Sequence, residues 1–405
     1  MASPTSEPAG RRAVRDALRW LVGAATVAAF ALRIAGLSYG LPDNLYHSDT
    51  PKQLDRVAHF LKGNLDPGDS YPAPHMYGVA LLLAGLFGLD PHALGDGPSW
   101  SQVVIAARLL NAALGAAMVP LLYAAGRWLL APRVAALAAV LLALAPLHII
   151  HSHHEMGDIP QTFFVVASLA AAARALVGGR PGALLAAGAL AGLAASTKYY
   201  GALAFGAVVV AALPGGCLSG PRAPSRRTRW LLVGAGVVAM VAFALATPRL
   251  LLAPRAFVEG LFQTQASLFV VPPPPLLQRP GVAASTLVVA TLDWIGPWIA
   301  GASLLGALLL CRRWPQGILV LVTPVLVLAV YVAFRPNYLD DRNLVILLPF
   351  MVLCAAHALH WLAGRGRWCR RAATLAGLAL VVTAAADAIG AAYLFQIDGE
   401  HSGRS

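Results

Sequence analysis

The sequence predicts an all-α protein that crosses a membrane many times. Of its 405 residues, 58% are hydrophobic and only 12% are charged, and the mean hydropathy is +0.68. Because a soluble domain carries about 25% charged residues, this composition excludes an ordinary cytosolic enzyme. A membrane-spanning helix needs about 20 predominantly apolar residues, and apolar stretches approaching that length recur along the chain.

These stretches predict about 11 transmembrane helices, at residues 17–38, 101–125, 134–150, 159–177, 183–198, 201–213, 230–247, 285–310, 316–334, 344–363 and 372–395. The first run has no small-residue cleavage pattern, so we expect it to be retained as a span. Residues 183–213 could instead form one broken pair. Residues 75–89 are too short to span and follow two prolines, which predicts a helix lying at the membrane surface. We expect one transmembrane domain over residues 1–395, a short tail over 396–405 and no separate soluble domain.

The distribution of charge supports this arrangement. Lys and Arg gather in the cytoplasmic loops of membrane proteins, and 18 of the 30 Lys and Arg residues fall in alternate loops. These are Arg11, Arg12, Arg15, Arg19, Arg127, Arg133, Arg174, Arg180, Arg222, Arg226, Arg227, Arg229, Arg312, Arg313, Arg365, Arg367, Arg370 and Arg371. The net charge of +12 therefore reports topology, with a cytoplasmic N-terminus, and we expect no nucleic-acid partner.

The opposite face is acidic and rich in histidine. Its predicted segments are a long first outer loop over 39–100, a turn over 151–158, and outer loops over 248–284 and 335–343. Of the 11 histidines, 8 lie between residues 47 and 154. Carboxylates can serve as general acids or bases, and cations suit phosphate binding. The outer face is therefore the predicted site of chemistry.

Three cations within or beside spans are unusual. Burying a charged side chain at the centre of a membrane helix costs roughly 2.5 to 3.5 kcal/mol, and such residues usually face a water-filled cavity. Arg33 lies near the outer end of the first span, where its side chain could instead snorkel to the interface. Arg108 and Lys198 are harder to explain by topology, and we predict that both line a cavity.

The first outer loop contains a candidate catalytic carboxylate. Thr50 and Pro51 suit the start of a helix, and residues 52–65 have an amphipathic pattern. Asp49 would then precede a helix N-terminus, where the helix dipole keeps a carboxylate ionised. An ordinary N-cap carboxylate is the structural alternative for Asp49.

The turn between two predicted spans combines histidines with acids, namely His148, His151, His153, His154, Glu155 and Asp158. Imidazole and carboxylate groups are metal ligands, so a divalent metal ion is a candidate cofactor. The spacing matches no specific metal motif, and solvated loop histidines are the alternative. The four cysteines show no zinc-binding spacing.

Several short motifs together resemble the GT-C membrane glycosyltransferases, in particular the family 39-like protein mannosyltransferases and aminoarabinose transferases. The matching segments occur in family order at His47 to Thr50, Tyr71 to Tyr77, Ala107 to Gly115, His151 to Phe164, Gly192 to Tyr199, Thr247 to Phe257 and Arg342 to Pro349. Two positions depart from the family pattern. The second acid of the first loop is Thr50 here, and the tyrosine after the late arginine is Asn343.

The resemblance implies an inverting transfer of a sugar from a polyprenyl-phosphate donor to a lipid, glycan or protein acceptor. It implies that Asp49 acts as general base and that Arg108, Lys198 and Arg342 bind the donor phosphate. Acceptor orientation or metal binding would fall to Asp158, His47, His154 and Glu155. We expect a multi-pass protein of a bacterial inner membrane, surrounded by membrane lipids, with its active site on the outer face.

A membrane transporter or flippase for a lipid-linked or anionic substrate is the alternative, since ionisable residues at span ends could also line a transport path. Transporters often consist of two related halves with interrupted helices at matching positions. The sequence shows no such symmetry. Its largest predicted loop follows the first span and lies on the outer side, as expected for a catalytic loop, so the transferase is the favoured hypothesis.

Overall fold

The protein is a bundle of α-helices. The computed structural model describes residues 9–41, 50–66, 74–87, 100–219, 223–267, 275, 277–334 and 340–402, and 84% of these residues are helical with no strand among them. The helices are α1 (Ala9–Ile34), α2 (Thr50–Leu61), α3 (Pro74–Phe87), α4 (Trp100–Leu129), α5 (Pro132–Ala143), α6 (Pro146–Ser152), α7 (Asp158–Gly178), α8 (Pro181–Thr197), η1 (Tyr199–Ala204), α9 (Phe205–Ala211), α10 (Arg226–Leu245), α11 (Pro248–Leu252), α12 (Pro254–Ser267), α13 (Arg279–Trp294), α14 (Pro297–Leu310), α15 (Gln316–Phe334), α16 (Asp341–Leu344), α17 (Leu348–Ala363) and α18 (Arg367–Ser402).

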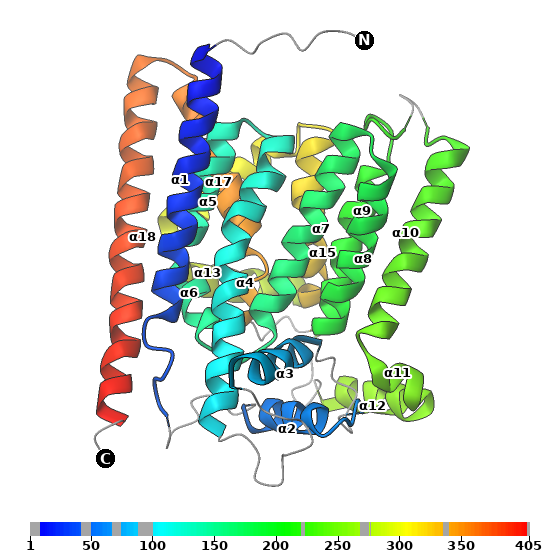
Figure 1. Cartoon of the computed structure of the whole chain (residues 1–405). Helices are drawn as coiled ribbons and strands as arrows, with labels where there is room; N and C mark the ends of the chain where they lie inside the picture. The colour runs from blue at the N-terminus through cyan, green and yellow to red at the C-terminus, as the bar shows by residue number, and fades with distance from the viewer. Residues whose placement is uncertain are drawn as a thin grey trace.

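The long helices stand upright, and a group of short helices lies across one end of the bundle (Figure 1). α1, α4, α7, α8, α10 and α18 run side by side, whereas α2, α3, α11 and α12 gather at the lower end. The position of α3 agrees with the surface helix expected over 75–89. The described helices of the predicted outer loops 39–100 and 248–284 that lie across the bundle thus share one end, and the arginine-rich turns after α4 and α7 lie at the other.

Within the described part of the chain, six helices are long and apolar enough to cross a membrane by themselves. They are Arg12–Ile34, Ser101–Leu129, Asp158–Gly178, Arg226–Leu245, Gln316–Phe334 and Arg367–Phe395. Shorter apolar helices, among them α14 and α17, fill the rest of the bundle. The predicted multi-pass fold is confirmed, but the number of about 11 spans is not.

Several predicted spans are interrupted in the structure, or begin and end at residues other than those predicted. The expected span over 285–310 is two helices, because Gly296 has a φ of 85° and Pro297 starts α14, and both features stop a helix. The expected span over 134–150 bends by 54° between α5 and α6, where Pro146 starts the second piece. The predicted span 344–363 begins as the separate helix α16, and α18 continues to Ser402 into the predicted tail.

The break within 183–213 matters for function. α8 ends at Thr197, and Lys198 has an extended backbone with φ −149° and ψ 135° before η1 begins. The alternative of one broken pair is thus the better description of this segment. Because the helix stops here, the Lys198 side chain leaves the end of α8 close to the start of α7.

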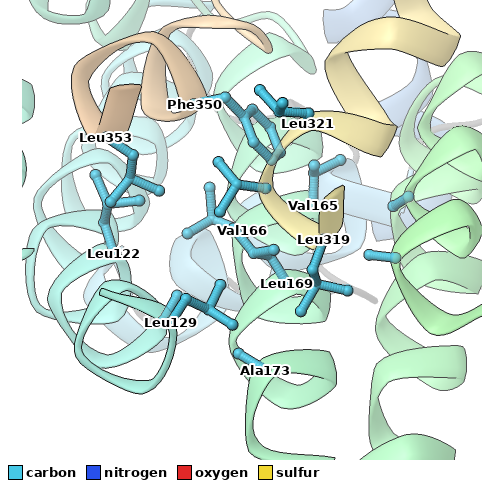
Figure 2. Packing of buried hydrophobic residues seen from close by; sticks show 14 of the residues in the cluster. Leu122, Leu129, Val165, Val166, Leu169, Ala173, Leu319, Leu321, Phe350 and Leu353 are labelled. Atoms are coloured by element: carbon cyan, nitrogen blue, oxygen red, sulfur yellow. The ribbon is translucent and has the colours of Figure 1, made fainter. Parts of the chain in front are cut away.

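The core lies between the central helices. Figure 2 shows Leu122 of α4, Val166 of α7 and Phe350 of α17 meeting in one cluster of buried side chains, together with Leu319 of α15. Because lipid tails are as apolar as leucine, helix association in a membrane relies on close packing and small residues. α8 follows this rule, since a Cβ at Gly192 would lie 2.1 Å from the Ala239 carbonyl oxygen of α10.

Candidate active site

Buried polar side chains gather where α4, α7 and α8 meet the surface helices α2 and α3. These elements contact one another at the lower end of the bundle. The buried polar residues contributed by them and by the turn before α7 include Thr50, His75, Arg108, Glu155, Asp158 and Lys198. Buried polar groups are costly unless they are paired, so this concentration indicates a functional site.

Arg108 and Glu155 form a buried ion pair. Arg108 Nε lies 3.2 Å from Glu155 Oε2, and the two side chains are 1% and 2% exposed. Arg108 Nη1 also donates to the carbonyl oxygens of Leu37 and Tyr39, each at 2.8 Å. The Thr50 hydroxyl donates to Glu155 Oε1. This network ties the first residue of α2 to the first third of α4 and to the turn before α7.

Asp158 and Lys198 form a second buried pair. Lys198 Nζ donates to Asp158 Oδ1, which holds the first residue of α7 against the end of α8. A carboxylate at a helix N-terminus is stabilised by the helix dipole. The charges of His151 and Arg342 also act on the Asp158 carboxylate. The second carboxylate oxygen, Oδ2, is buried and has no hydrogen-bond partner among the described residues.

Residues 340–343, which include α16, contact the turn before α7 through His151. His151 Nε2 lies 3.3 Å from Asp341 Oδ2, and Arg342 Nε lies 3.0 Å from Asp340 Oδ2. Partial burial opposes ionisation of Asp341, but the interactions with His151, Asp340 and the Arg342 backbone together outweigh it, so the pKa of Asp341 lies below its usual range. The structure therefore brings Arg342 to the site that contains Asp158 and Lys198.

His75 is a site residue that the sequence interpretation did not select. It lies in the first turn of α3 and is 5% exposed. A Cβ added at Gly157 would lie 3.0 Å from His75 Cε1, so the missing side chain at Gly157 lets α3 approach the start of α7. Desolvation by burial, with the nearby charges of Arg56 and Lys198, lowers the pKa of His75 to about 3. The sequence signal for this site residue is a single histidine at the start of an otherwise apolar stretch.

Of the remaining predicted site residues, the structure describes His154 but not His47 and Asp49. His47 and Asp49 lie outside the described residues, so their predicted roles stay predictions. His154 is half-buried, and its ring lies 5.2 Å from the ring of His151. The Asn111 side chain donates to the carbonyl oxygens of His154 and Met156, which anchors the turn to α4.

The described residues do not offer a metal site. The predicted histidine turn is divided among separate partners, because His148 Nδ1 lies 2.9 Å from Arg33 Nη2 and His153 contacts the carbonyl oxygens of Ile149 and Ala35. Among described residues, no group of three His, Cys, Asp or Glu side chains could hold a metal ion. Arg33 is fully buried, which contradicts the snorkelling interpretation.

Replacing Arg108 by Leu is expected to lower the free energy of unfolding by about 3–5 kcal/mol, because breaking a buried ion pair leaves an uncompensated charge. Chemical unfolding of the purified protein in detergent measures this loss. Arg127→Leu, at the exposed end of the same helix, is the matched control and should stay within about 0.5 kcal/mol of the wild type. A loss for Arg108→Leu no larger than that of the control would contradict the assignment.

His75 should make stability depend on pH. Its folded pKa of about 3 lies below the unfolded value of about 6.5, so the unfolded chain binds the extra proton between these values. The contribution of His75 to the free energy of unfolding is present above pH 6.5. It falls as the pH decreases, by roughly 2 kcal/mol between pH 6.5 and 5. Unfolding of His75→Leu should show a smaller loss over this range, whereas the exposed-site variant His59→Leu should follow the wild type. Parallel curves for all three proteins would exclude this contribution.

One protein-family model matches part of the chain. The family described as dolichyl-phosphate-mannose-protein mannosyltransferase matches residues 71–214. This range contains Arg108, Asp158 and Lys198, whereas Asp49 and Arg342 lie outside it. No curated protein sequence matches the chain.

Comparison with solved structures identifies the fold. ArnT from Cupriavidus metallidurans in the apo state has a TM-score of 0.58 at 17% identity, covering 96% of this chain and 78% of that one. The same protein bound to undecaprenyl phosphate gives 0.52 at 16% identity, with coverages of 95% and 77%. The Archaeoglobus fulgidus oligosaccharyltransferase in complex with Zn and sulfate gives 0.56 at 15% identity, with coverages of 92% and 53%.

These similarities confirm the GT-C fold that the sequence motifs predicted. The protein is a multi-pass membrane protein with that architecture. The chain spans about half the length of the oligosaccharyltransferase.

Proposed function

We propose that this protein transfers a sugar from a polyprenyl-phosphate donor to an acceptor lipid, glycan or protein. The observation that carries the proposal is the buried Asp158–Lys198 pair, which lies within the residues matched by the mannosyltransferase family. The solved relatives support the choice of donor, since one binds undecaprenyl phosphate and another was solved with a dolichol-phosphate.

In the proposed reaction, Asp49 acts as general base. Its carboxylate takes the proton from the acceptor hydroxyl, and the acceptor oxygen attacks the anomeric carbon of the donor sugar. The bond from this carbon to the phosphate oxygen breaks on the opposite face, which inverts the configuration. The products are the glycosylated acceptor and polyprenyl monophosphate. Asp49 precedes Thr50, the residue that contacts Glu155 in the site.

Lys198 and Arg342 are the proposed cations for the leaving phosphate. Buried cations directed at a developing negative charge act most strongly where water is excluded, and Lys198 is 8% exposed. For Arg108, also predicted at the phosphate, we propose a positioning role. Its Nε and Nη1 already donate to Glu155 and to two carbonyl oxygens, so it orients the turn before α7.

The remaining polar residues are proposed to orient substrates. His47, His154 and Glu155 would orient the acceptor, and Asp158 would bind a substrate hydroxyl through its unpartnered oxygen. A divalent metal ion stays a candidate cofactor: no group of three His, Cys, Asp or Glu side chains among the described residues could hold one, and His47 and Asp49 lie outside those residues. We further propose that the end with α2 and α3 faces outward from a bacterial inner membrane, with the N-terminus in the cytoplasm.

A transfer assay with the purified protein tests this function. The protein is reconstituted in liposomes with polyprenyl-phosphate mannose or polyprenyl-phosphate aminoarabinose as donor, and with membrane lipids and peptides as acceptors. Release of polyprenyl monophosphate together with a glycosylated acceptor is the expected result. Movement of the intact donor across the bilayer without cleavage would support the flippase alternative and contradict the transferase.

A further inference from the structure

Unpartnered polar atoms converge at the first turn of α7. Among the described residues, both ring nitrogens of His75, Asp158 Oδ2 and Gln161 Oε1 are buried and lack a hydrogen-bond partner. The charge of Asp158 acts on His75, and Gln161 lies one turn after Asp158 on α7. None of these atoms is used by the Arg108–Glu155 network.

Leaving such groups unpartnered is costly. A buried donor or acceptor without a partner loses its hydrogen bonds to water and gains none in return, so four such atoms in one place require an explanation. The neighbouring contacts fix their orientation. Gln161 Nε2 donates to the Lys198 carbonyl oxygen at 3.3 Å, which leaves Oε1 as an acceptor, and Lys198 occupies Asp158 Oδ1. The free atoms are therefore held ready for a ligand.

The chemistry of these atoms indicates which ligand they suit. A carboxylate oxygen and an amide oxygen only accept hydrogen bonds, and a neutral imidazole has one donor and one acceptor. Such a set is complementary to hydroxyl groups and unsuited to a phosphate, which supplies acceptors itself. An amino sugar is disfavoured as well, because Lys198 already pairs with Asp158 and neutralises its charge, and the charge of Arg56 also acts on His75.

We propose that His75, Asp158 and Gln161 form the subsite that binds the hydroxyl groups of the transferred sugar, and that this sugar is neutral. The assignment rests on the proposed function. It specifies that the hydroxyl group bound by Asp158 belongs to the donor sugar and not to the acceptor. His75 is then a specificity-determining residue that contacts the sugar ring, while Lys198 and Arg342 face the phosphate to which the ring is attached.

Binding measurements without acceptor test this subsite. The probes are polyprenyl-phosphate mannose, polyprenyl-phosphate aminoarabinose and bare polyprenyl phosphate, titrated into the purified full-length protein in detergent. His75→Leu should weaken binding of the mannose lipid about tenfold, the effect of losing one or two hydrogen bonds, and change binding of the bare lipid by less than twofold. His75→Gln should recover part of the loss, and His59→Leu should change neither.

The outcomes separate this inference from the proposed function. Equal weakening of the mannose lipid and the bare lipid by His75→Leu, or tighter wild-type binding of the aminoarabinose lipid, overturns the subsite and leaves the transferase standing. Wild-type protein that binds none of the three lipids overturns both. A purely structural His75 would lower the thermal stability of the ligand-free variant at neutral pH, whereas a ligand-binding His75 should not. Gln161→Leu provides a second variant with the same expected pattern.

Discussion

Replacing Asp49 by Asn is expected to reduce the turnover number of sugar transfer by about 10²- to 10⁴-fold, the contribution of a general base. An amide cannot take the proton of the acceptor hydroxyl, whereas its size is nearly that of the carboxylate. The Michaelis constants for donor and acceptor should change little, because the lost interaction develops only in the transition state. The measurement is steady-state transfer by the purified variant with its lipid donor.

Asp55→Asn is the matched control for this experiment, since Asp55 is an exposed acid in α2, the helix that begins after Asp49. It should retain wild-type turnover. Near wild-type turnover of Asp49→Asn would remove Asp49 from the mechanism. Within the described residues, Asp158 and Glu155 already have cationic partners, so neither is an obvious replacement for the base.

Replacing Lys198 by Met is expected to lower the turnover number by about 10²- to 10³-fold, the loss seen when one preorganised group that stabilises transition-state charge is removed. The ammonium group would no longer offset the charge that develops on the leaving phosphate. Lys198→Arg, which keeps the charge, should retain more activity. The exposed-site variant Lys62→Met serves as control.

This variant also leaves Asp158 as an unpaired buried carboxylate, so its stability must be measured together with its activity. The double variant Asp158→Asn with Lys198→Met removes both charges. It should recover stability relative to Lys198→Met, because a buried charge without a partner is the main cost, but it should not recover turnover. Full activity in the double variant would show that Lys198 serves only to neutralise Asp158.

Much of the fold could be predicted because hydropathy is a property of the sequence alone. The apolar stretches predicted the multi-pass helices, and the arginines predicted which loops share one end of the bundle. The interruptions were harder to predict. Gly296 and Pro297 gave a local signal for the break between α13 and α14, but the chain remains apolar through it. A prediction from hydropathy alone therefore treats α13 and α14 as a single span.

The candidate site could be predicted in part. Arg108 and Lys198 could be predicted because charges near membrane spans are costly, and Asp158 because it ends the turn that combines histidines with acids. The structure places all three at the same end of the bundle. Their partners were not predictable, since Arg108 and Glu155 are 47 positions apart in the chain. His75 was missed because a single histidine in an apolar helix gives no indication of what surrounds it.

The sequence by itself determined that this protein is a helical membrane protein with 18 of its 30 Lys and Arg residues in alternate loops, because composition and hydropathy act locally along the chain. Only the tertiary structure decided which charges pair and which polar atoms remain without a partner. Those outcomes depend on contacts between α3, α4, α7 and α8, which are distant in sequence. The histidine turn illustrates the difference, since its residue types suggested metal binding and its packing divides the side chains among Arg33, backbone carbonyls and Asp341.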